Sequence, residues 1–153
     1  MKWPRVGTAA IAAALLMAAS SAVAQSRKAP EFLASPALDF ESYRTRVEPI
    51  FLKRRPGHAR CIVCHASDNR AFRLLPLSPG SATWTEEQSR RNFENVSNLV
   101  VPGSPASSPL LLHPLAAEAG GDRFHSGGRQ FTSQNDPDWQ IVAEWVRQAK
   151  PAH

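Results

Sequence analysis

The chain contains only two cysteines, and both lie in one short run, Cys61-Ile62-Val63-Cys64-His65. This C-x-x-C-H spacing is typical of covalent haem attachment. On one helical turn the two thiols reach the two vinyl groups of a porphyrin, and the histidine that follows points its imidazole at the iron from the same side. The motif therefore predicts one covalently bound haem c, with Cys61 and Cys64 as attachment sites and His65 as the proximal axial ligand.

Two other chemistries also use paired cysteines. A redox-active dithiol or a disulfide has the same C-x-x-C spacing, but a thioredoxin-type site needs a βαβ setting that this sequence does not predict. A zinc site needs four ligands, so a chain with two cysteines has to recruit two distant histidines, and no second half-motif is present. Both remain alternatives to haem attachment.

Residues 1–24 have the three parts of a secretory signal peptide. A positively charged start is followed by an apolar run over residues 7–19 and by the small-x-small cleavage site at residues 22–24. The apolar run is too short to span a bilayer, and an uncleaved anchor is the alternative. We expect an exported protein, periplasmic or secreted, that starts at Gln25 and has no stable membrane insertion after cleavage.

The charge of the remaining chain is small. Without Lys2 and Arg5 it has 16 basic and 13 acidic residues, a charge of +3. That value is too low to predict nucleic-acid binding. The basic run Lys53-Arg54-Arg55 is either a solvated helix end or a docking face for an acidic redox partner protein.

Apolar spacing and capping signals predict helices joined by long loops, with no alternating strand pattern and no repeat. The expected helical stretches are Asp39 to Phe51 with a kink or restart at Pro49, the cysteine motif, a helix opened by the capping box Thr85–Gln88, a short helix with Ser108 as cap and Pro109 as first residue, and a last helix after Asp136-Pro137. We therefore expect a flexible lead-in over residues 25–38 and an all-α domain over residues 39–150. So few helices make a small core by themselves, which favours a cofactor at the centre.

The second axial position cannot be taken by methionine. Met1 and Met17 both lie in the signal segment, so the exported chain has none. Four histidines are the candidates in addition to the proximal one: His58, His113, His125 and His153.

These four histidines are not equivalent. His58 lies three residues before Cys61, on the tethered side of the ring, and His153 is the terminal residue. His125 is favoured because flanking glycines let a loop lie close along the porphyrin face. His113, beside leucines at the end of a short helix, is the alternative distal ligand.

The chain resembles the planctomycete-type cytochrome c-like domains, which are single-haem modules of secreted bacterial proteins. The resemblance covers most of Asp39 to Ala149 and rests on Val47–Phe51, the motif Cys61–His65, Val101–Pro105 with Ser108 and Leu110, and Trp145. It implies a small helical domain with long loops wrapped around one haem.

The resemblance also bears on the distal ligand. In that family the segment after the Pro-Gly loop usually supplies a methionine, and here Phe124-His125-Ser126-Gly127-Gly128 stands in its place. The departure implies a histidine pair, and a histidine pair implies a lower reduction potential than methionine ligation gives.

The sequence thus predicts an exported monohaem c-type cytochrome that carries single electrons, and it favours this carrier role over an enzymatic one. One alternative is a haem enzyme or gas-binding sensor, peroxidase-like, whose iron has an open sixth site because neither His113 nor His125 binds it. Another is a module that delivers electrons only within a larger complex. Six further residues are interpreted as ordinary core or surface, with haem packing or propionate neutralisation as the alternative: Trp84, Trp139, Trp145, Arg70, Arg73 and Arg129.

Overall fold

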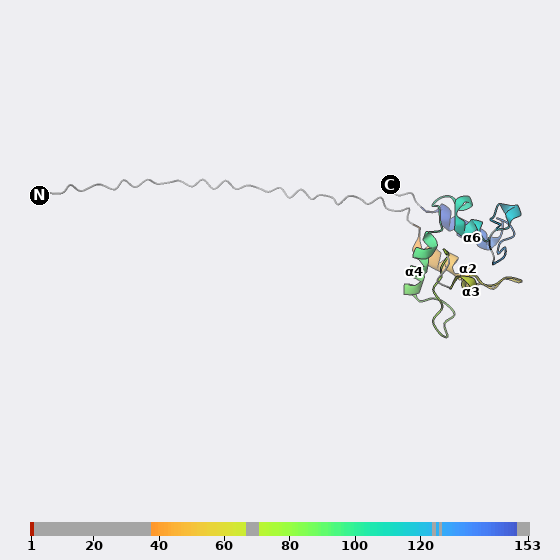
Figure 1. The fold of residues 1–153 in the computed structure, drawn as a ribbon, viewed down its shortest axis with the longest axis horizontal. Helices are drawn as coiled ribbons and strands as arrows, with labels where there is room; N and C mark the ends of the chain where they lie inside the picture. Colours follow the sequence, from red (N-terminus) through yellow and green to blue (C-terminus); the bar gives the residue numbers. More distant parts are fainter. Residues whose placement is uncertain (2–37, 67–70, 124, 126, 150–153) are drawn as a thin grey trace. The chain divides into compact units, whose positions relative to one another are not determined.

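The computed structural model describes residue 1 and residues 38–66, 71–123, 125 and 127–149. The predicted signal segment, nearly all of the lead-in, Arg70 and His153 lie outside these residues. All described elements belong to the unit Phe32–His153. Figure 1 shows them in order: α1 (Phe40–Ser42), the π-helical turn η1 (Tyr43–Val47), α2 (Glu48–Leu52), α3 (Cys61–His65), α4 (Glu86–Ser97), η2 (Pro105–Ser107), α5 (Pro109–Leu112), η3 (Ala117–Ala119) and α6 (Pro137–Arg147).

The predicted all-α class is confirmed for the part of the chain that the structure describes. That part has no strand and only two isolated β-bridges, Arg55 with His58 and Leu115 with Phe131. Nor does any helix in it have the length and apolar character that crossing a membrane requires.

The first helical stretch begins and ends close to the predicted positions, but its interior is irregular. The Asp39 carboxylate caps it by accepting a hydrogen bond of 2.6 Å from the Ser42 backbone N–H. The π-helical turn then lies immediately before α2, where Pro49 is the second residue. Because proline has no N–H to donate to the carbonyl four residues back, the backbone widens there and continues as a helix.

The two long helices start at the predicted capping residues. In the capping box of α4, the Gln88 backbone N–H donates to Thr85 Oγ1 (3.3 Å) and the Thr85 N–H donates to Gln88 Oε1 (3.0 Å). In α6 the Asp136 carboxylate accepts from the Asp138 N–H (2.9 Å) and the Trp139 N–H (3.4 Å). The N-terminal starts of α4 and α6 can be predicted from local sequence because each cap and its hydrogen-bond partners lie within three residues of one another.

An aromatic cluster joins the beginning of the domain to its end. The ring centre of Tyr43 lies 5.3 Å from that of Phe93 on α4 and 5.6 Å from that of Trp145 on α6. Helix α6 buries the predicted face, since Trp139, Val142, Trp145 and Val146 are all buried. These contacts bury apolar area far apart in sequence and hold α4 and α6 on one core.

The three tryptophans of the helical domain, Trp84, Trp139 and Trp145, are core residues. Each indole N–H donates to a backbone carbonyl: Trp84 to Leu75 (2.7 Å), Trp139 to Leu111 (3.4 Å) and Trp145 to Asp39 (2.9 Å). Because the single donor of each indole is already used inside the domain, the interpretation of these residues as ordinary core is confirmed.

Ser108 is the N-cap residue of α5 and Pro109 is its first residue, as predicted, but the Ser108 hydroxyl makes no capping hydrogen bond. The hydroxyl accepts from the Val101 N–H (2.9 Å) and lies 2.9 Å from the Ser104 carbonyl oxygen, so it closes the preceding loop. A capping side chain accepts from the second or third N–H of its helix, and both already have partners: Leu110 donates to the Leu99 carbonyl (3.1 Å) and Leu111 to the Ser108 carbonyl (2.9 Å). The same loop is held on α6 by the Gly103 N–H, which donates to the Val146 carbonyl (2.9 Å).

Replacing the buried hydroxyl (Ser108→Ala) leaves the Val101 N–H without its partner. We expect the free energy of unfolding to fall by about 1–3 kcal/mol, measured by urea unfolding followed by tryptophan fluorescence. Ser107→Ala, at the exposed neighbouring position, is the matched control and should change it by less than about 0.5 kcal/mol. Equal stability of the two variants would contradict the role assigned to Ser108.

Candidate functional site

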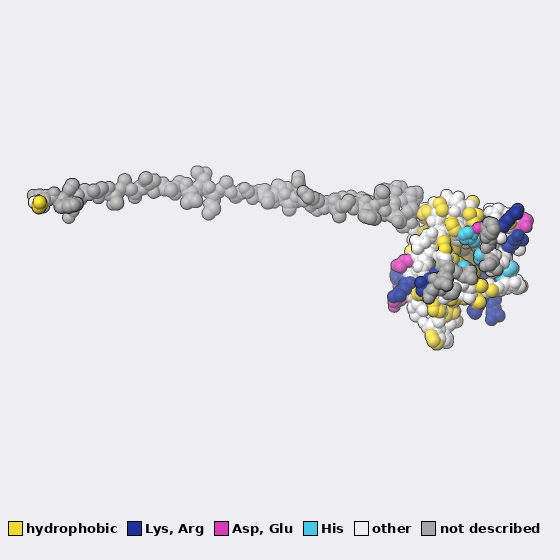
Figure 2. Space-filling view, in the orientation of Figure 1, with side chains coloured by type: hydrophobic (Ala, Val, Ile, Leu, Met, Phe, Trp, Pro, Cys, Tyr) yellow, Lys and Arg dark blue, Asp and Glu magenta, His cyan; other side chains and the backbone are white. Residues whose placement is uncertain are grey.

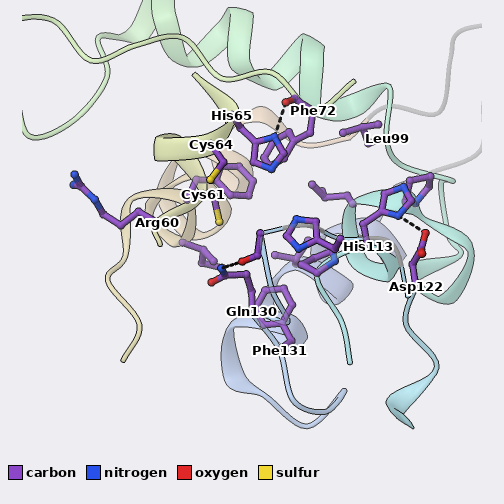
Figure 3. Close-up of a pocket in the computed structure, with 18 of the residues that line it drawn as sticks. Arg60, Cys61, Cys64, His65, Phe72, Leu99, His113, Asp122, Gln130 and Phe131 are labelled. Carbon is purple, nitrogen blue, oxygen red and sulfur yellow. Dashed lines mark hydrogen bonds and ion pairs between the residues drawn. The ribbon is translucent and has the colours of Figure 1, made fainter. Parts of the chain in front are cut away.

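A cavity of about 530 Å³ lies beside α3, and Figure 3 shows the side chains that line it. Five of its lining residues are the ones that the sequence analysis proposed as cofactor-binding: Cys61, Cys64, His65, His113 and His125. Most of the remaining wall is apolar. The volume falls in the range of cavities that hold small ligands and cofactors. Figure 2 shows histidine side chains gathered on one face of the domain.

Helix α3 presents the cysteine motif to this cavity. Figure 1 shows α3 beside α2, and Ile62 is the buried residue that anchors it, whereas Val63 points outward and is exposed. Cys61 and Cys64 are not joined in a disulfide. Both thiols and the imidazole of the motif therefore reach the same cavity, as one helical turn predicts.

His65 is oriented by a backbone carbonyl. Its Nδ1 lies 2.8 Å from the Phe72 carbonyl oxygen, and its ring centre lies 4.4 Å from that of the Phe72 ring. Because a carbonyl oxygen only accepts, Nδ1 carries the proton in this hydrogen bond. The bond therefore selects Nε2 as the nitrogen with which this imidazole binds a metal.

His125 is held in the same way from another segment. Its Nδ1 lies 2.5 Å from the Gly128 carbonyl oxygen, so this ring also carries its proton on Nδ1. The two glycines after it are needed for this turn. A Cβ at Gly127 would lie 3.1 Å from the His125 ring, and Gly128 has φ +83°, a conformation that favours glycine.

The two imidazoles form a near-parallel pair. The ring centres of His65 and His125 are 6.2 Å apart, and their planes differ by 14°. One ring ends α3 and the other lies 60 positions later in the chain, so the pair arises only when the domain folds. Of the predicted candidates, His125 is the histidine paired in this way with the proximal one.

His113 lines the same cavity but has a different partner. Its Nδ1 lies 2.7 Å from Asp122 Oδ2, and its side chain is 52% exposed. Figure 3 shows this pair at one side of the cavity. Asp122 was missed by sequence reasoning. The sequence feature that could have indicated it is the neighbouring Gly121. A Cβ at Gly121 would lie 2.0 Å from the Leu115 carbonyl oxygen, so only glycine lets the segment with Asp122 pack this closely against Leu115.

Among the described residues, three other side chains named by the sequence analysis do not line the cavity. His58 is absent from its wall, as are Arg73 and Arg129, and Arg129 instead lies 3.6 Å from Glu118 in an exposed ion pair. The arginine in the wall is Arg60, which precedes the cysteine motif and was not singled out by the sequence analysis.

The basic run before the motif is largely used inside the domain. Lys53 Nζ lies 2.8 Å from Asp138 Oδ2, and Arg55 pairs with both Asp136 and Asp138. The tertiary fold places the two aspartates at the start of α6 against Lys53 and Arg55. Two of the three positive charges of this run are therefore neutralised within the domain, which weakens its interpretation as a docking face.

Neither alternative for the cysteines is favoured by this geometry. Burial raises the pKa of the Cys61 thiol from its ordinary value of 9.0 to about 11, whereas a reactive dithiol needs a lowered pKa. Within the described residues, no three or more His, Cys, Asp or Glu side chains converge to hold a metal ion by themselves. A zinc site thus has no ligand set in that part of the chain.

No protein-family model matches this chain, and searches of curated proteins and of solved structures gave no match either.

Before any haem is attached, the Cys61 thiol should react slowly with iodoacetamide. A pKa of about 11 leaves little thiolate at pH 7, and we expect alkylation about tenfold slower than for an exposed cysteine. The measurement uses Cys64→Ser, which leaves Cys61 as the only thiol, and the same variant in urea is the control. Equal rates in the two conditions would contradict burial of this thiol, and a faster rate in the folded protein would favour the reactive dithiol.

Proposed function

We propose that this protein is an exported monohaem c-type cytochrome that carries single electrons, similar to the planctomycete-type cytochrome c-like domains. Cys61 and Cys64 would hold one haem covalently, with His65 as proximal and His125 as distal axial ligand. The observation that supports this most is the imidazole pair across one cavity, 6.2 Å between ring centres, beside both cysteines.

The residues present fit a haem. Imidazole nitrogens bind metals at about 2 Å, so two imidazoles on opposite sides of one metal ion have ring centres about 6 Å apart. The pair meets this requirement, and each ring has its Nδ1 engaged by a backbone carbonyl, as metal-binding histidines usually do. A porphyrin supplies four nitrogens of its own, so two protein ligands suffice.

When bound, the haem would supply an iron that takes up and releases one electron. The chain's own residues do the rest. The carbonyls of Phe72 and Gly128 hold the protons on Nδ1 and fix both ring orientations. The largely apolar cavity wall would limit the access of water to the iron. Two imidazole ligands leave no position for a substrate, and they favour a lower reduction potential than a histidine with a methionine.

A second candidate function is a haem enzyme or gas-binding sensor with an open sixth site. The observation that favours it is the pair His113–Asp122, which lines the same cavity and is a titratable acid/base pair of the kind that peroxidase-like chemistry needs. This function requires that His125 does not bind the metal. The hydrogen bond from His125 to the Gly128 carbonyl, which orients the ring, favours the opposite.

Export is part of the proposal, because haem attachment to C-x-x-C-H and the signal segment at residues 1–24 point to the same compartment. The redox partner would be a protein, and Lys53 and Arg55 offer it little net charge, since both side chains pair with aspartates within the domain.

The visible spectrum of the purified mature protein tests the proposal. Expressed with haem-attachment machinery, it should give sharp, split reduced bands that brief exposure to carbon monoxide does not shift, and the haem should resist extraction by acid and organic solvent. An immediate carbon monoxide shift would favour the enzyme or sensor. Absence of any haem spectrum would overturn both.

The distal assignment is tested by His125→Ala. Loss of this ligand should convert a low-spin haem into a high-spin one that binds carbon monoxide, because the sixth position opens. His113→Ala is the matched control and should leave the low-spin spectrum unchanged. The reverse pattern would move the distal ligand to His113.

A further inference from the structure

Arg55 joins three separate parts of the domain. Its guanidinium donates to Asp136 through two bonds of 2.9 and 3.2 Å, to Asp138, and to the Gln130 backbone carbonyl at 3.1 Å. The same group lies 4.8 Å from the centre of the Phe131 ring. The side chain is only 16% exposed, so these bonds are largely shielded from water.

Gln130 continues the connection on its other side. Its side-chain Nε2 donates to the Ala59 carbonyl (3.2 Å) and lies 3.5 Å from the Gly127 carbonyl. Figure 3 shows Gln130 at the cavity wall. Ala59 lies two residues before Cys61, and Gly127 lies two residues after His125, so one buried amide touches both ligand-bearing segments.

The charges of this cluster are balanced. Arg55 and Lys53 face Asp136 and Asp138. Burial opposes ionisation of Asp136, but the Arg55 hydrogen bond and the two backbone N–H groups of α6 outweigh it and hold its pKa below the ordinary value. The carboxylate therefore stays charged at neutral pH, and the pair keeps Arg55 in place.

We infer that Arg55 and Gln130 are positioning residues that hold the segment carrying His125 at a fixed separation from the segment carrying Cys61 and His65. This inference rests on the proposed haem function. Arg55 fixes the Gln130 backbone against α6, and the Gln130 side chain then ties residue 59 to residue 127. The two imidazoles lie 6.2 Å apart, and this connection would hold that separation in addition to any bonds that the two rings make to haem iron.

Gln130→Leu tests the inference, because leucine fills the space without donating a hydrogen bond and without becoming an iron ligand. If His125 is the sixth ligand, carbon monoxide can bind the reduced haem only after His125 detaches. The rate of this detachment would then limit the rate of carbon monoxide binding. Loss of a buried hydrogen bond should raise the rate of carbon monoxide binding roughly tenfold. The matched control is Gln134→Leu, an exposed glutamine whose amide donates to Ala119 (3.0 Å) away from the cavity wall. Its rate should equal that of the unmodified protein.

A second variant covers the case in which Gln130→Leu does not fold. Arg55→Lys keeps the positive charge, but its three N–H donors cannot replace the four hydrogen bonds that Arg55 makes, so it should also speed carbon monoxide binding. Arg46→Lys changes an exposed ion pair with Glu144 on the same helix α6 (2.8 Å) and should not.

Two results would overturn the inference. One is an unchanged rate in Gln130→Leu and Arg55→Lys; the other is an equal rise in Ser108→Ala, which lowers stability without touching either segment. Both presuppose a low-spin covalent haem in the unmodified protein, so they leave the proposed function intact. A failure of the proposed function is instead seen in the unmodified protein, which would lack that haem, and it would remove the inference as well.

Discussion

The ion pairs between Arg55 and the two aspartates at the start of α6 are the interaction on which the arrangement of the site depends. They join the segment that leads into α3 to a helix more than 80 positions away, and Arg55 also contacts the Gln130 carbonyl between them. A charged group this shielded is costly unless it is fully paired. The fold supplies the partners, and the segments on either side of the cavity are therefore held together.

The cavity itself explains why the domain has so few helices. Its described helices are short apart from α4 and α6, and much of the chain runs as loops around the wall. A protein of this size needs a packed centre. Under the proposed function the haem fills that centre, with the two imidazoles on its two sides.

Under the proposed function, the side of the cavity opposite His65 would decide between electron transfer and other haem chemistry. His125 has the orientation of a ligand, whereas His113 is paired with Asp122 and half exposed. Under the proposed function, the first arrangement would close the sixth position and suit a carrier. The second places an acid/base pair at the same cavity, so the two candidate functions would differ in whether His125 binds the iron.

The sequence by itself determined what depends on neighbouring residues. The cysteine motif, the caps at Thr85 and Asp136 and the buried face of α6 could all be predicted, because each partner lies within a few positions. The tertiary structure decided what depends on distant segments. It brought His125 opposite His65, turned the Ser108 hydroxyl away from its helix, and paired Lys53 and Arg55 with aspartates that local pattern does not connect to them. The physical reason is that contacts across long stretches of chain form only when the whole core packs, so no local spacing encodes them.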